Sequence, residues 1–563
     1  MGLSAVSTGP AHPEDTAKRL LAEAVRHHRA GELDQAIALY ERLLKFVPDM
    51  APAHANLGVA LRARGRLEDA EASYRRSLAL APGTTDVLFN LGNLKRDQGA
   101  VAEAAALYRT VLESDAAHAA ARTNLGLVLR DSGDTAAAYD ELARVAAEQP
   151  NRPEPQLNLA LVLSDLQRYA EAARVCHRAL ALNPRYAGAL NLLGHCLRQL
   201  GHLEDAVACY RRAVALVPEL ADAHAGLGHA LIAQGWLGEA IISFDQALSL
   251  DPDHLQAHLG RAYVHLVSGR WAPGLEDYRW RWRAREAKPR HLPMAEWDGQ
   301  DLSGKSILLW AEQGFGDTLL ASRFVPLVKA QGATVILECQ SALRRLFERL
   351  PGIDHFADPH EGPPPVDYHA PLMELPRLFG AYPSTVPPAP DLRPDTAAAS
   401  KFETLLEPVG DRITVGIAWA GNPKFPGDAQ RSVKPERFLP LALDPKVQLV
   451  SLQVDASEAS LSELSPVRPI LNAAPLITDF ADTAALIDRL DLVITVDSAV
   501  GHLAGTLGRP SWLLITFSPY WVWLLDREDT PWYPSMRLFR QTKPGDWDGV
   551  FKRVVEELQR FER

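Results

Sequence analysis

The sequence predicts an all-α repeat solenoid followed by an α/β region made of two halves, each with a parallel sheet. Two observations support this prediction. The first half of the 563-residue chain superposes on itself at an offset of 34 residues, a period typical of stacked helix pairs. From Ser306 onward, short apolar runs alternate with helical segments, as expected for strand–helix–strand units.

Four positions recur in the 34-residue unit. An alanine stands at Ala36, Ala70, Ala104, Ala138, Ala172, Ala206 and Ala240, and a bulky residue usually follows four positions later. A small residue recurs earlier in each unit, and a proline closes most units. The pattern resembles the tetratricopeptide repeat, in which small residues let two antiparallel helices approach and the proline ends the second helix. Seven units run from about residue 17 to 254, and a partial eighth reaches Tyr278.

Asparagine recurs at one position of four consecutive units, as Asn56, Asn90, Asn124 and Asn158. Each is expected on the first helix of its unit, so the amides would form a ladder along the inner surface. An amide offers both a donor and an acceptor and can pair with any peptide backbone. The ladder resembles the one in the repeats of O-GlcNAc transferase, which holds a protein substrate. The alternative is that these amides only bond neighbouring helices.

Composition excludes several classes of protein. The formal charge of −11 argues against an extended nucleic-acid footprint, and no apolar run approaches the roughly 18 residues that cross a bilayer. The N-terminus lacks the pattern of a secretory signal, so we expect a cytoplasmic protein. The cysteines are too sparse for a disulfide framework and are expected to be reduced packing residues: Cys176, Cys196, Cys209 and Cys339.

The segment from Tyr278 to Arg285 alternates arginine with tryptophan, a composition that could stack on nucleic-acid bases. In a helix, however, Tyr278 and Trp282 would share one face. We therefore expect this segment to pack the last helix onto the following domain, and we expect no nucleic-acid partner.

The α/β region is expected to begin after the repeats. The expected domain limits are a disordered tail over 1–16, repeats over 17–286, and α/β halves over 287–400 and 401–563. Strands are expected at 307–310, 334–338, 413–419, 448–452, 492–496 and 512–517, with helices at 317–329 and 341–350. A proline-rich stretch around 362–394 is expected to join the halves. Ligands of such sheets bind beyond the C-terminal strand ends.

Two loops beyond expected strand ends could hold an anion. Gly314 and Gly316 permit a tight turn before a helix, whose N-terminus favours negative charge. Spacing alone favours a helix-capping role for Asp317. In the other loop, Asp497 or Ser498 would cap a helix whose free amides form a seat for phosphate. His502 would lie near that anion, although a histidine here is more often a hydrogen-bonded core residue.

A third loop runs from Trp419 to Ser432 and contains Asn422, Lys424 and Arg431. Cations beyond a strand end can neutralise phosphate charge on a leaving group. Surface lysines usually have no such role, so the interpretation depends on this loop sharing an edge with the Asp497 loop.

Several of these motifs together resemble heptosyltransferase-type enzymes of glycosyltransferase family 9. They are G-x-G-D-T-L, W-A-G-N with a following R-S, S-L-Q at 451–453, D-F-A-D-T-A-A-L-I at 479–487 and V-D-S-x-x-x-H. The layout is also similar to that of bacterial proteins that fuse tetratricopeptide repeats to such a domain. These include flagellin glycosyltransferases that use a nonulosonic acid such as pseudaminic acid.

The resemblance implies a GT-B α/β domain of two Rossmann-like halves that inverts the anomeric centre of a nucleotide-activated sugar. Asp317 matches the family's proposed catalytic base. The positions expected at the donor are Gly314, Gly316, Asn422, Arg431, Gln453, Asp497, Ser498 and His502, with Lys424 near the family's phosphate-binding lysine but in a longer, proline-rich loop. No metal is expected. Two D-x-D sequences, Asp251/Asp253 and Asp546/Asp548, lie in a repeat turn and at the expected start of the last helix.

We therefore expect a protein O-glycosyltransferase whose repeats hold an acceptor such as flagellin. Two alternatives stay open. One is a heptosyltransferase-like enzyme with a carbohydrate acceptor, and the other is a non-enzymatic scaffold with a degenerate transferase domain. The sequence leaves both a CMP-linked nonulosonate and a diphosphate-linked sugar open as the donor.

Overall fold

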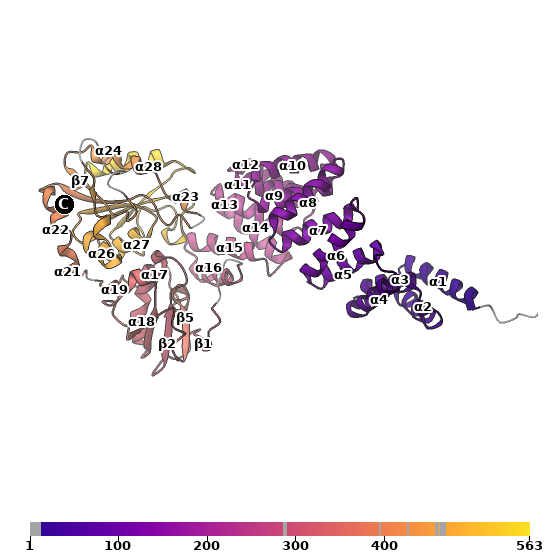
Figure 1. Cartoon of the computed structure of the whole chain (residues 1–563). Coiled ribbons are helices and arrows are strands. Elements are labelled where there is room, and N and C mark those ends of the chain that lie inside the picture. Colours follow the sequence, from indigo (N-terminus) through magenta and orange to yellow (C-terminus); the bar gives the residue numbers. More distant parts are fainter. Residues whose placement is uncertain are drawn as a thin grey trace, which may run out of the picture. The chain divides into compact units, whose positions relative to one another are not determined.

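The computed structural model describes residues 13–284, 290–392, 394, 396–424, 427–456, 461 and 469–562. The chain divides into two compact units, Met1–Gly226 and Leu227–Arg563, and each is described by itself (Figure 1). The expected order of folds is confirmed: helical repeats come first, and two parallel sheets with helices follow. The expected tail over residues 1–16 lies mostly outside the described residues, and the expected domain limits stay predictions.

The first unit is built from consecutive helix pairs. Its helices are α1 (Pro13–Arg29), α2 (Leu33–Phe46), α3 (Ala51–Ala63), α4 (Leu67–Leu80), α5 (Thr85–Asp97), α6 (Val101–Ser114), α7 (Ala119–Asp131), α8 (Thr135–Glu148), α9 (Pro153–Asp165), α10 (Tyr169–Leu182), α11 (Ala187–Gln199) and α12 (Leu203–Leu216). Helix α13 (Ala221–Ala233) spans the limit between the units.

The recurring small residue explains how each pair packs. A Cβ added to Gly58 would lie 2.6 Å from the ring of Tyr74, and one added to Gly92 would lie 2.8 Å from Tyr108. The aromatic ring of the second helix therefore lies directly on the backbone of the first. Tyr74 and Tyr108 are fully buried, so these contacts form the core of the repeats.

The second unit begins with the last repeat helices and continues into the α/β region. The repeat helices are α14 (Leu237–Leu250), α15 (Leu255–Val267) and α16 (Trp271–Tyr278), followed by the 3₁₀ helix η1 (Arg279–Arg283). The helices that follow in the first α/β half are α17 (Phe315–Ala321), η2 (Ser322–Phe324), α18 (Val325–Ala330), α19 (Ser341–Phe347), η3 (Leu372–Glu374) and α20 (Leu375–Leu378).

The remaining helices lie after this first half. They are α21 (Thr396–Ser400), α22 (Glu403–Leu406), η4 (Glu407–Val409), α23 (Asp428–Arg431), η5 (Pro435–Phe438), α24 (Leu439–Ala442), η6 (Ala474–Leu476), α26 (Phe480–Ile487), α27 (Ala499–Thr506), η7 (Trp521–Trp523) and α28 (Trp547–Leu558).

Both sheets are parallel throughout. The first has the order β1-β5-β2-β3-β4, with β1 (Ala295–Glu296), β2 (Ser306–Trp310), β3 (Thr334–Glu338), β4 (His355–Phe356) and β5 (Tyr368–Pro371). The second has the order β11-β10-β9-β6-β7-β8, with β6 (Ile413–Ala418), β7 (Val447–Ser451), β8 (Leu471–Asn472), β9 (Leu492–Val496), β10 (Ser511–Ile515) and β11 (Met536–Arg540).

The sequence located six of these strands to within two residues and missed the other five. One missed strand, β5, pairs with β2 inside the proline-rich stretch that was expected only to join the halves. The helix expected at 317–329 is divided into α17, η2 and α18. Pro326 lies in the first turn of α18, where a backbone N–H would have no partner within the helix, so proline costs no helical hydrogen bond.

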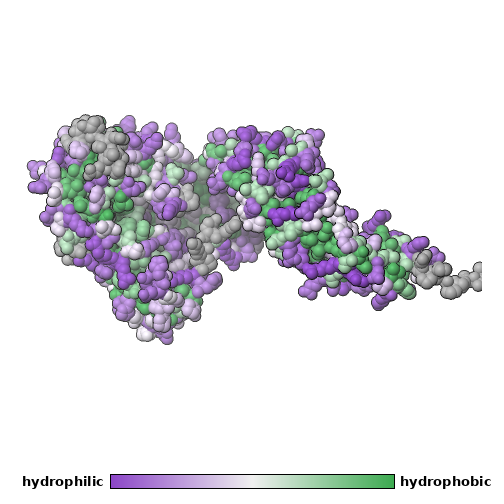
Figure 2. All heavy atoms as spheres, viewed as in Figure 1, coloured by the Kyte–Doolittle hydropathy of each residue, from purple (hydrophilic) through white to green (hydrophobic). Residues whose placement is uncertain are grey.

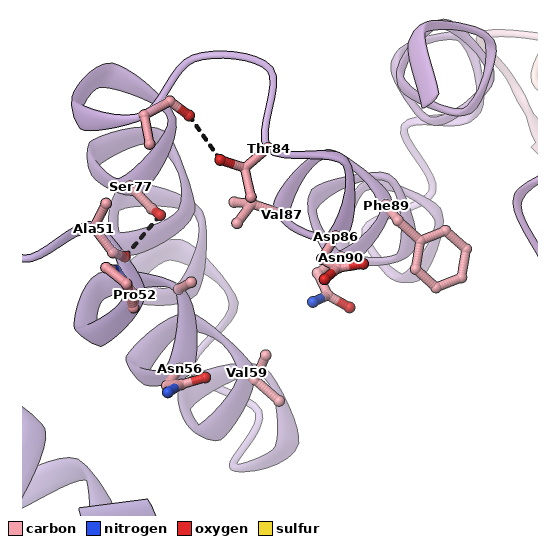
Figure 3. Close-up of a pocket in the computed structure, with 12 residues that line it drawn as sticks. Ala51, Pro52, Asn56, Val59, Ser77, Thr84, Asp86, Val87, Phe89 and Asn90 are labelled. Carbon is pink, nitrogen blue, oxygen red and sulfur yellow. Dashed lines mark hydrogen bonds between the residues drawn. The ribbon is translucent and has the colours of Figure 1, made fainter. Parts of the chain in front are cut away.

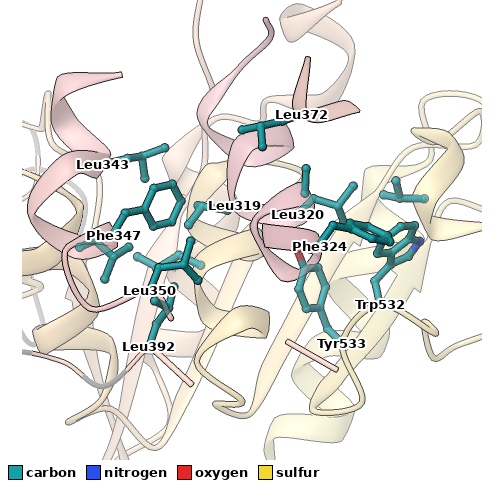
Figure 4. Packing of buried hydrophobic residues seen from close by; sticks show 14 of the residues in the cluster. Leu319, Leu320, Phe324, Leu343, Phe347, Leu350, Leu372, Leu392, Trp532 and Tyr533 are labelled. Atoms are coloured by element: carbon teal, nitrogen blue, oxygen red, sulfur yellow. The ribbon is translucent and has the colours of Figure 1, made fainter. Parts of the chain in front are cut away.

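One continuous core joins the two halves and the last repeat. Figure 4 shows Leu319, Leu320 and Phe324 between α19 and two aromatic residues of the second half, Trp532 and Tyr533. Leu266, Trp271 and Leu275 of the last repeat belong to the same cluster. On the visible surface, hydrophilic residues predominate, with hydrophobic residues gathered in smaller patches (Figure 2).

The arginine–tryptophan segment packs against the α/β region, as expected. Arg281 donates to Glu312 at 2.8 Å and forms an ion pair with Glu374 at 2.8 Å. The rings of Trp282 and Trp310 lie 5.7 Å apart. The segment is a 3₁₀ helix and not the expected α-helix, and residue 285 lies outside the described residues.

Candidate active site

Asp317 lies in the first turn of α17, beyond the end of β2, and contacts both halves. Its Oδ2 accepts the backbone N–H of Gly314 at 3.1 Å, so it has the capping role that spacing alone favoured. Its Oδ1 accepts the hydroxyl of Tyr520, from the second half, at 2.8 Å. Burial raises the pKa of Asp317, while these two bonds and the charge of Arg431 oppose that rise.

Gly316 and His502 bring the two halves into contact. A Cβ at Gly316 would lie 2.7 Å from Cδ2 of His502, so only glycine allows α17 to approach α27 this closely. His502 is buried, and its Nδ1 lies 3.0 Å from the Tyr533 hydroxyl. Burial lowers the pKa of His502 to about 3, so the imidazole is neutral at pH 7. His502 thus has the burial and the hydrogen bond of the core residue that was the alternative to an anion ligand, and its role at the donor stays a prediction.

Asp497 and Ser498 follow β9 directly and are both buried. Burial raises the pKa of Asp497 to about 6, and the nearby charge of Asp317 adds to this effect. Ser498 is the N-cap residue of α27, but its side chain accepts no bond from the first turn; its Oγ lies 3.1 Å from Oγ1 of Thr495. The first-turn amides of α27 are therefore not capped by Ser498, which suits the anion seat that the sequence predicted.

Arg431 supplies positive charge beside both aspartates. Its charge partly opposes the rise that burial causes in the pKa of Asp317 and of Asp497, so its guanidinium lies within electrostatic range of each carboxylate. It bonds Asp428 at 3.1 Å and lies over Gly421, where a Cβ would come within 2.9 Å of Nη2. The glycine of the W-A-G-N motif thus leaves room for the guanidinium.

Gln453 positions the loop that carries Arg431. Its Oε1 accepts the backbone N–H of Ala420 at 3.2 Å, and its Nε2 donates to Asp455 at 2.8 Å. Since β9, β6 and β7 are neighbours in the second sheet, the loops after these strands meet at one edge.

Asn422 and Lys424 are exposed in the same loop. The side chain of Asn422 accepts the backbone N–H of Lys424 at 3.0 Å, a local turn that holds the loop backbone. The structure therefore brings together Gly316, Asp317, Arg431, Asp497 and His502, with Gly314, Gln453 and Ser498 as supports. It gives Asn422 a structural role and leaves the Lys424 ammonium at the surface.

Sequence reasoning did not place Tyr520 or Tyr278 at the candidate site. Tyr520 lies in an irregular segment between β10 and η7, where no periodicity marks it. Tyr278 ends α16. Its hydroxyl accepts a hydrogen bond of 2.7 Å from Nε2 of Gln313, which lies in the loop that carries Asp317. The aromatic density from 520 to 523 was the one available signal.

The repeat asparagines occupy the first helices of their units, α3, α5, α7 and α9, as expected, and all four are half-buried. Asn56 and Asn90 line a pocket of about 490 Å³ in the first unit (Figure 3). Most of the other lining residues are apolar: Ala51, Pro52, Ala55, Val59, Ala81, Val87 and Phe89. Asn124 differs, because its Nδ2 donates at 2.7 Å to Asn93, which also accepts the Tyr108 hydroxyl.

The remaining candidates have structural roles. Asp546 caps α28, and Asp253 pairs with Arg283. All four cysteines are free and buried, as expected. Within the described ranges, no group of three or more histidine, cysteine or acidic residues is arranged to hold a metal ion. No helix in the same part of the chain is both long and apolar enough to cross a membrane.

Family models match both parts of the chain. Those of the tetratricopeptide repeat match residues 21–84, 89–153, 194–235 and 221–254. The model described as glycosyltransferase family 9 (heptosyltransferase) matches residues 446–516. The chain therefore combines tetratricopeptide repeats with a segment that matches glycosyltransferase family 9. The family 9 match includes Gln453, Asp497, Ser498 and His502 but not Asp317.

Individual proteins resemble parts of this chain. Protein FlbA of Caulobacter vibrioides is 32% identical over 329 residues, which is 54% of each chain, so this chain spans about half the length of that curated relative. A tetratricopeptide repeat protein from Parabacteroides merdae is 18% identical, with a TM-score of 0.39 over 44% of this chain and 98% of its own. MamA protein is 25% identical, with a TM-score of 0.27 over 30% and 93%.

Proposed function

We propose that this protein is an inverting glycosyltransferase of GT-B type that transfers a nucleotide-activated sugar to a hydroxyl of a protein held by the repeats. One observation carries the proposal. A half-buried carboxylate with a raised pKa, Asp317, faces a loop of the family 9 segment that holds Asp497, with Arg431 near both. Acid–base groups with perturbed pKa values and an adjacent cation are typical of catalytic sites.

In this mechanism Asp317 acts as the general base. It takes the proton of the acceptor hydroxyl while the hydroxyl oxygen bonds to the anomeric carbon, and the bond from that carbon to the donor phosphate breaks on the opposite face. Because burial raises the pKa of Asp317, its carboxylate accepts a proton more readily than that of an ordinary aspartate. The α27 amides and Arg431 would stabilise the departing phosphate, and we expect no metal ion to be required.

The pocket at Asn56 and Asn90 supports a protein acceptor. The two amides can bond the backbone of an extended segment, and the apolar lining can receive one of its side chains. Flagellin is the acceptor that we propose, modified on Ser or Thr in the cytoplasm, with CMP-pseudaminic acid or a related nonulosonate as a candidate donor.

Intact mass measurement tests the proposal. The full chain is incubated with flagellin and a panel of nucleotide sugars, and flagellin is then weighed. The expected result is a mass increase equal to one or more sugar residues with one donor. No increase with any donor would count against a flagellin glycosyltransferase. Thermal shift with CMP, ADP, UDP and GDP identifies the nucleotide, because a bound ligand stabilises the native state.

The family description favours a second candidate, an enzyme with a carbohydrate acceptor, since it names heptosyltransferases. A lipopolysaccharide core acceptor in place of flagellin distinguishes the two. Asp317→Ala separates both enzymes from a non-enzymatic scaffold. Either enzyme should lose transfer while its acceptor still binds, and undiminished transfer would remove Asp317 from the mechanism.

A further inference from the structure

We propose that Tyr520 is a positioning residue for Asp317, and that the last helix pair of the repeats holds Tyr520 in place. The inference deepens the proposed function and rests on the role of Asp317 as the base. In this proposal, α15 and α16 belong to the repeat array and also support the active site.

The bonds to Asp317 orient its carboxylate. Tyr520 donates to Oδ1 at 2.8 Å, and the Gly314 N–H donates to Oδ2 at 3.1 Å. One donor on each oxygen fixes the plane of the carboxylate. Each oxygen keeps a lone pair with which to accept the proton of an incoming hydroxyl. A base must be held in this way because small errors in orientation reduce the rate strongly.

The neighbours of Tyr520 are held by the last repeat. The Tyr263 hydroxyl, on α15, donates to the carbonyl of Pro519 at 3.1 Å. Trp271, on α16, lies edge-to-face with Trp521 at 5.5 Å. Trp271 is fully buried, so its position is fixed by the core. The residues on both sides of Tyr520 are therefore fixed by α15 and α16.

The same segment is held from the other side by the second sheet. Arg540, on β11, donates to the carbonyls of Trp523, Leu524 and Arg527. Leu524 has a φ of 51°, a conformation that non-glycine residues adopt only where their surroundings require it. Two independent supports thus hold the segment that presents the Tyr520 hydroxyl.

A second contact links the last repeat to the Asp317 loop. Tyr278, at the end of α16, accepts Nε2 of Gln313 at 2.7 Å, and the Gln313 carbonyl accepts Nε2 of Gln340 at 2.8 Å. The last repeat therefore contacts both the segment that donates to Asp317 and the loop that carries it.

Tyr520→Phe removes the hydroxyl and keeps the ring. We expect kcat to fall tenfold or more while KM for the donor stays within about twofold, because the hydroxyl acts through Asp317. The acid limb of the kcat/KM profile should also move to higher pH, because the bond from Tyr520 favours the ionised carboxylate. The other titratable or charged groups around Asp317 are Arg431, Asp497, Tyr278 and Tyr533, and the variant leaves them unchanged.

The test compares three tyrosine variants in the full chain. Tyr263→Phe should give a smaller loss of kcat, because it removes only the anchor at Pro519. The exposed Tyr382 provides the matched control, and Tyr382→Phe should leave both kcat and the pH profile unchanged. A normal acid limb and normal kcat in Tyr520→Phe would overturn the proposal. If Tyr520→Phe fails to fold, the kcat of Tyr263→Phe provides the test. An unchanged kcat in Tyr263→Phe would overturn the role of α15.

A second readout separates this inference from the proposed function. Selective ¹³C labelling of aspartate, with Asp317→Asn to assign the signal, gives the carboxyl pKa without any turnover. We expect that pKa to be higher in Tyr520→Phe than in the unaltered protein. If the unaltered protein transfers no sugar, the proposed function fails. If the carboxyl pKa does not change, the positioning role fails.

Discussion

Gly316 and His502 lie so close together that a methyl group on Gly316 would come within 2.7 Å of the imidazole carbon Cδ2. The imidazole cannot easily move, because it bonds the Tyr533 hydroxyl and lies against the ring of Trp523. This contact joins α17 of the first half to α27 of the second. The glycine therefore determines how closely the two halves can approach.

Gly316→Ala should destabilise the α/β region by about 1–3 kcal/mol, the usual cost of overpacking a rigid site. Chemical denaturation, followed by tryptophan fluorescence, measures the change. Gly314→Ala is the matched control, since a Cβ there meets only Asp317 at an ordinary 3.4 Å. Equal stability of the two variants would show that α17 can move away from His502 at no cost.

Asp482 is the centre of an ion cluster that joins the two halves. The fully buried carboxylate bonds Arg345 of α19 and Lys401, which follows α21, at 2.5 and 2.8 Å. These partners and Thr478 hold its pKa well below the usual range. We expect Asp482→Asn to cost about 2 kcal/mol at pH 7.

The pH dependence gives the sign of this effect. A depressed pKa contributes stability above the unfolded value of about 4 and loses it as the pH falls through the folded value. The difference between Asp482→Asn and the unaltered protein should therefore shrink below pH 4. Asp488→Asn, on an exposed side chain just after the same helix, should change little at either pH. A constant difference across this range would rule out ionic stabilisation by Asp482.

Asp497 should have the opposite effect on stability. Its pKa is raised to about 6, so the folded protein binds the proton more tightly than the unfolded chain between pH 4 and 6. Stability therefore falls as the pH rises through this window and stays lower above it. We expect Asp497→Asn to stabilise the protein by about 2 kcal/mol at pH 8 and by less at pH 5. Denaturation at the two pH values tests this, and an unchanged or reduced stability at pH 8 would contradict it.

The repeat asparagines should divide into two functional classes. Asn56→Ala together with Asn90→Ala should weaken acceptor binding about tenfold at unchanged thermal stability, because two hydrogen bonds to the ligand are lost. Asn124→Ala should instead lower the stability of the first unit by about 1 kcal/mol, since Asn93 loses a donor.

Calorimetric titration of flagellin and thermal denaturation together measure both effects of the asparagine variants. Binding that is unchanged in the Asn56/Asn90 double variant would eliminate the pocket as the acceptor site. If Asn124→Ala is as stable as the unaltered protein but binds the acceptor more weakly, Asn124 contacts the acceptor and is not a structural residue.

Periodic features were predictable from the sequence. The 34-residue spacing identified the helix pairs, and the apolar runs identified strands such as β9, which are buried on both faces. Strand β5 was missed because it has four residues, ends at Pro371 and lies in a stretch where prolines indicate loops. Strands β1, β4 and β8 have two residues each, too few to form a pattern.

The site was predictable only in part for a related reason. Motif spacing identified Asp317 and Asp497 as candidates, but the bond between Asp317 and Tyr520 joins residues 203 positions apart. Spacing also could not show whether His502 faces a ligand or the core, since both choices place it one turn into α27. The Asn124 amide illustrates the same limit, because its acceptor, Asn93, stands at a position where asparagine does not recur in the neighbouring repeats.

The contacts of Trp271 bear on how this protein can be recombined with others. A chimaera that replaces the repeat array should keep a folded α/β region only if the foreign sequence ends before α15. Loss of Trp271 would remove the packing partner of Trp521 and Trp532, loss of Tyr263 would remove the anchor of the Pro519 loop, and loss of Arg281 would remove the counterion of Glu312. Grafting of foreign repeats is thus confined to the helices upstream of residue 255.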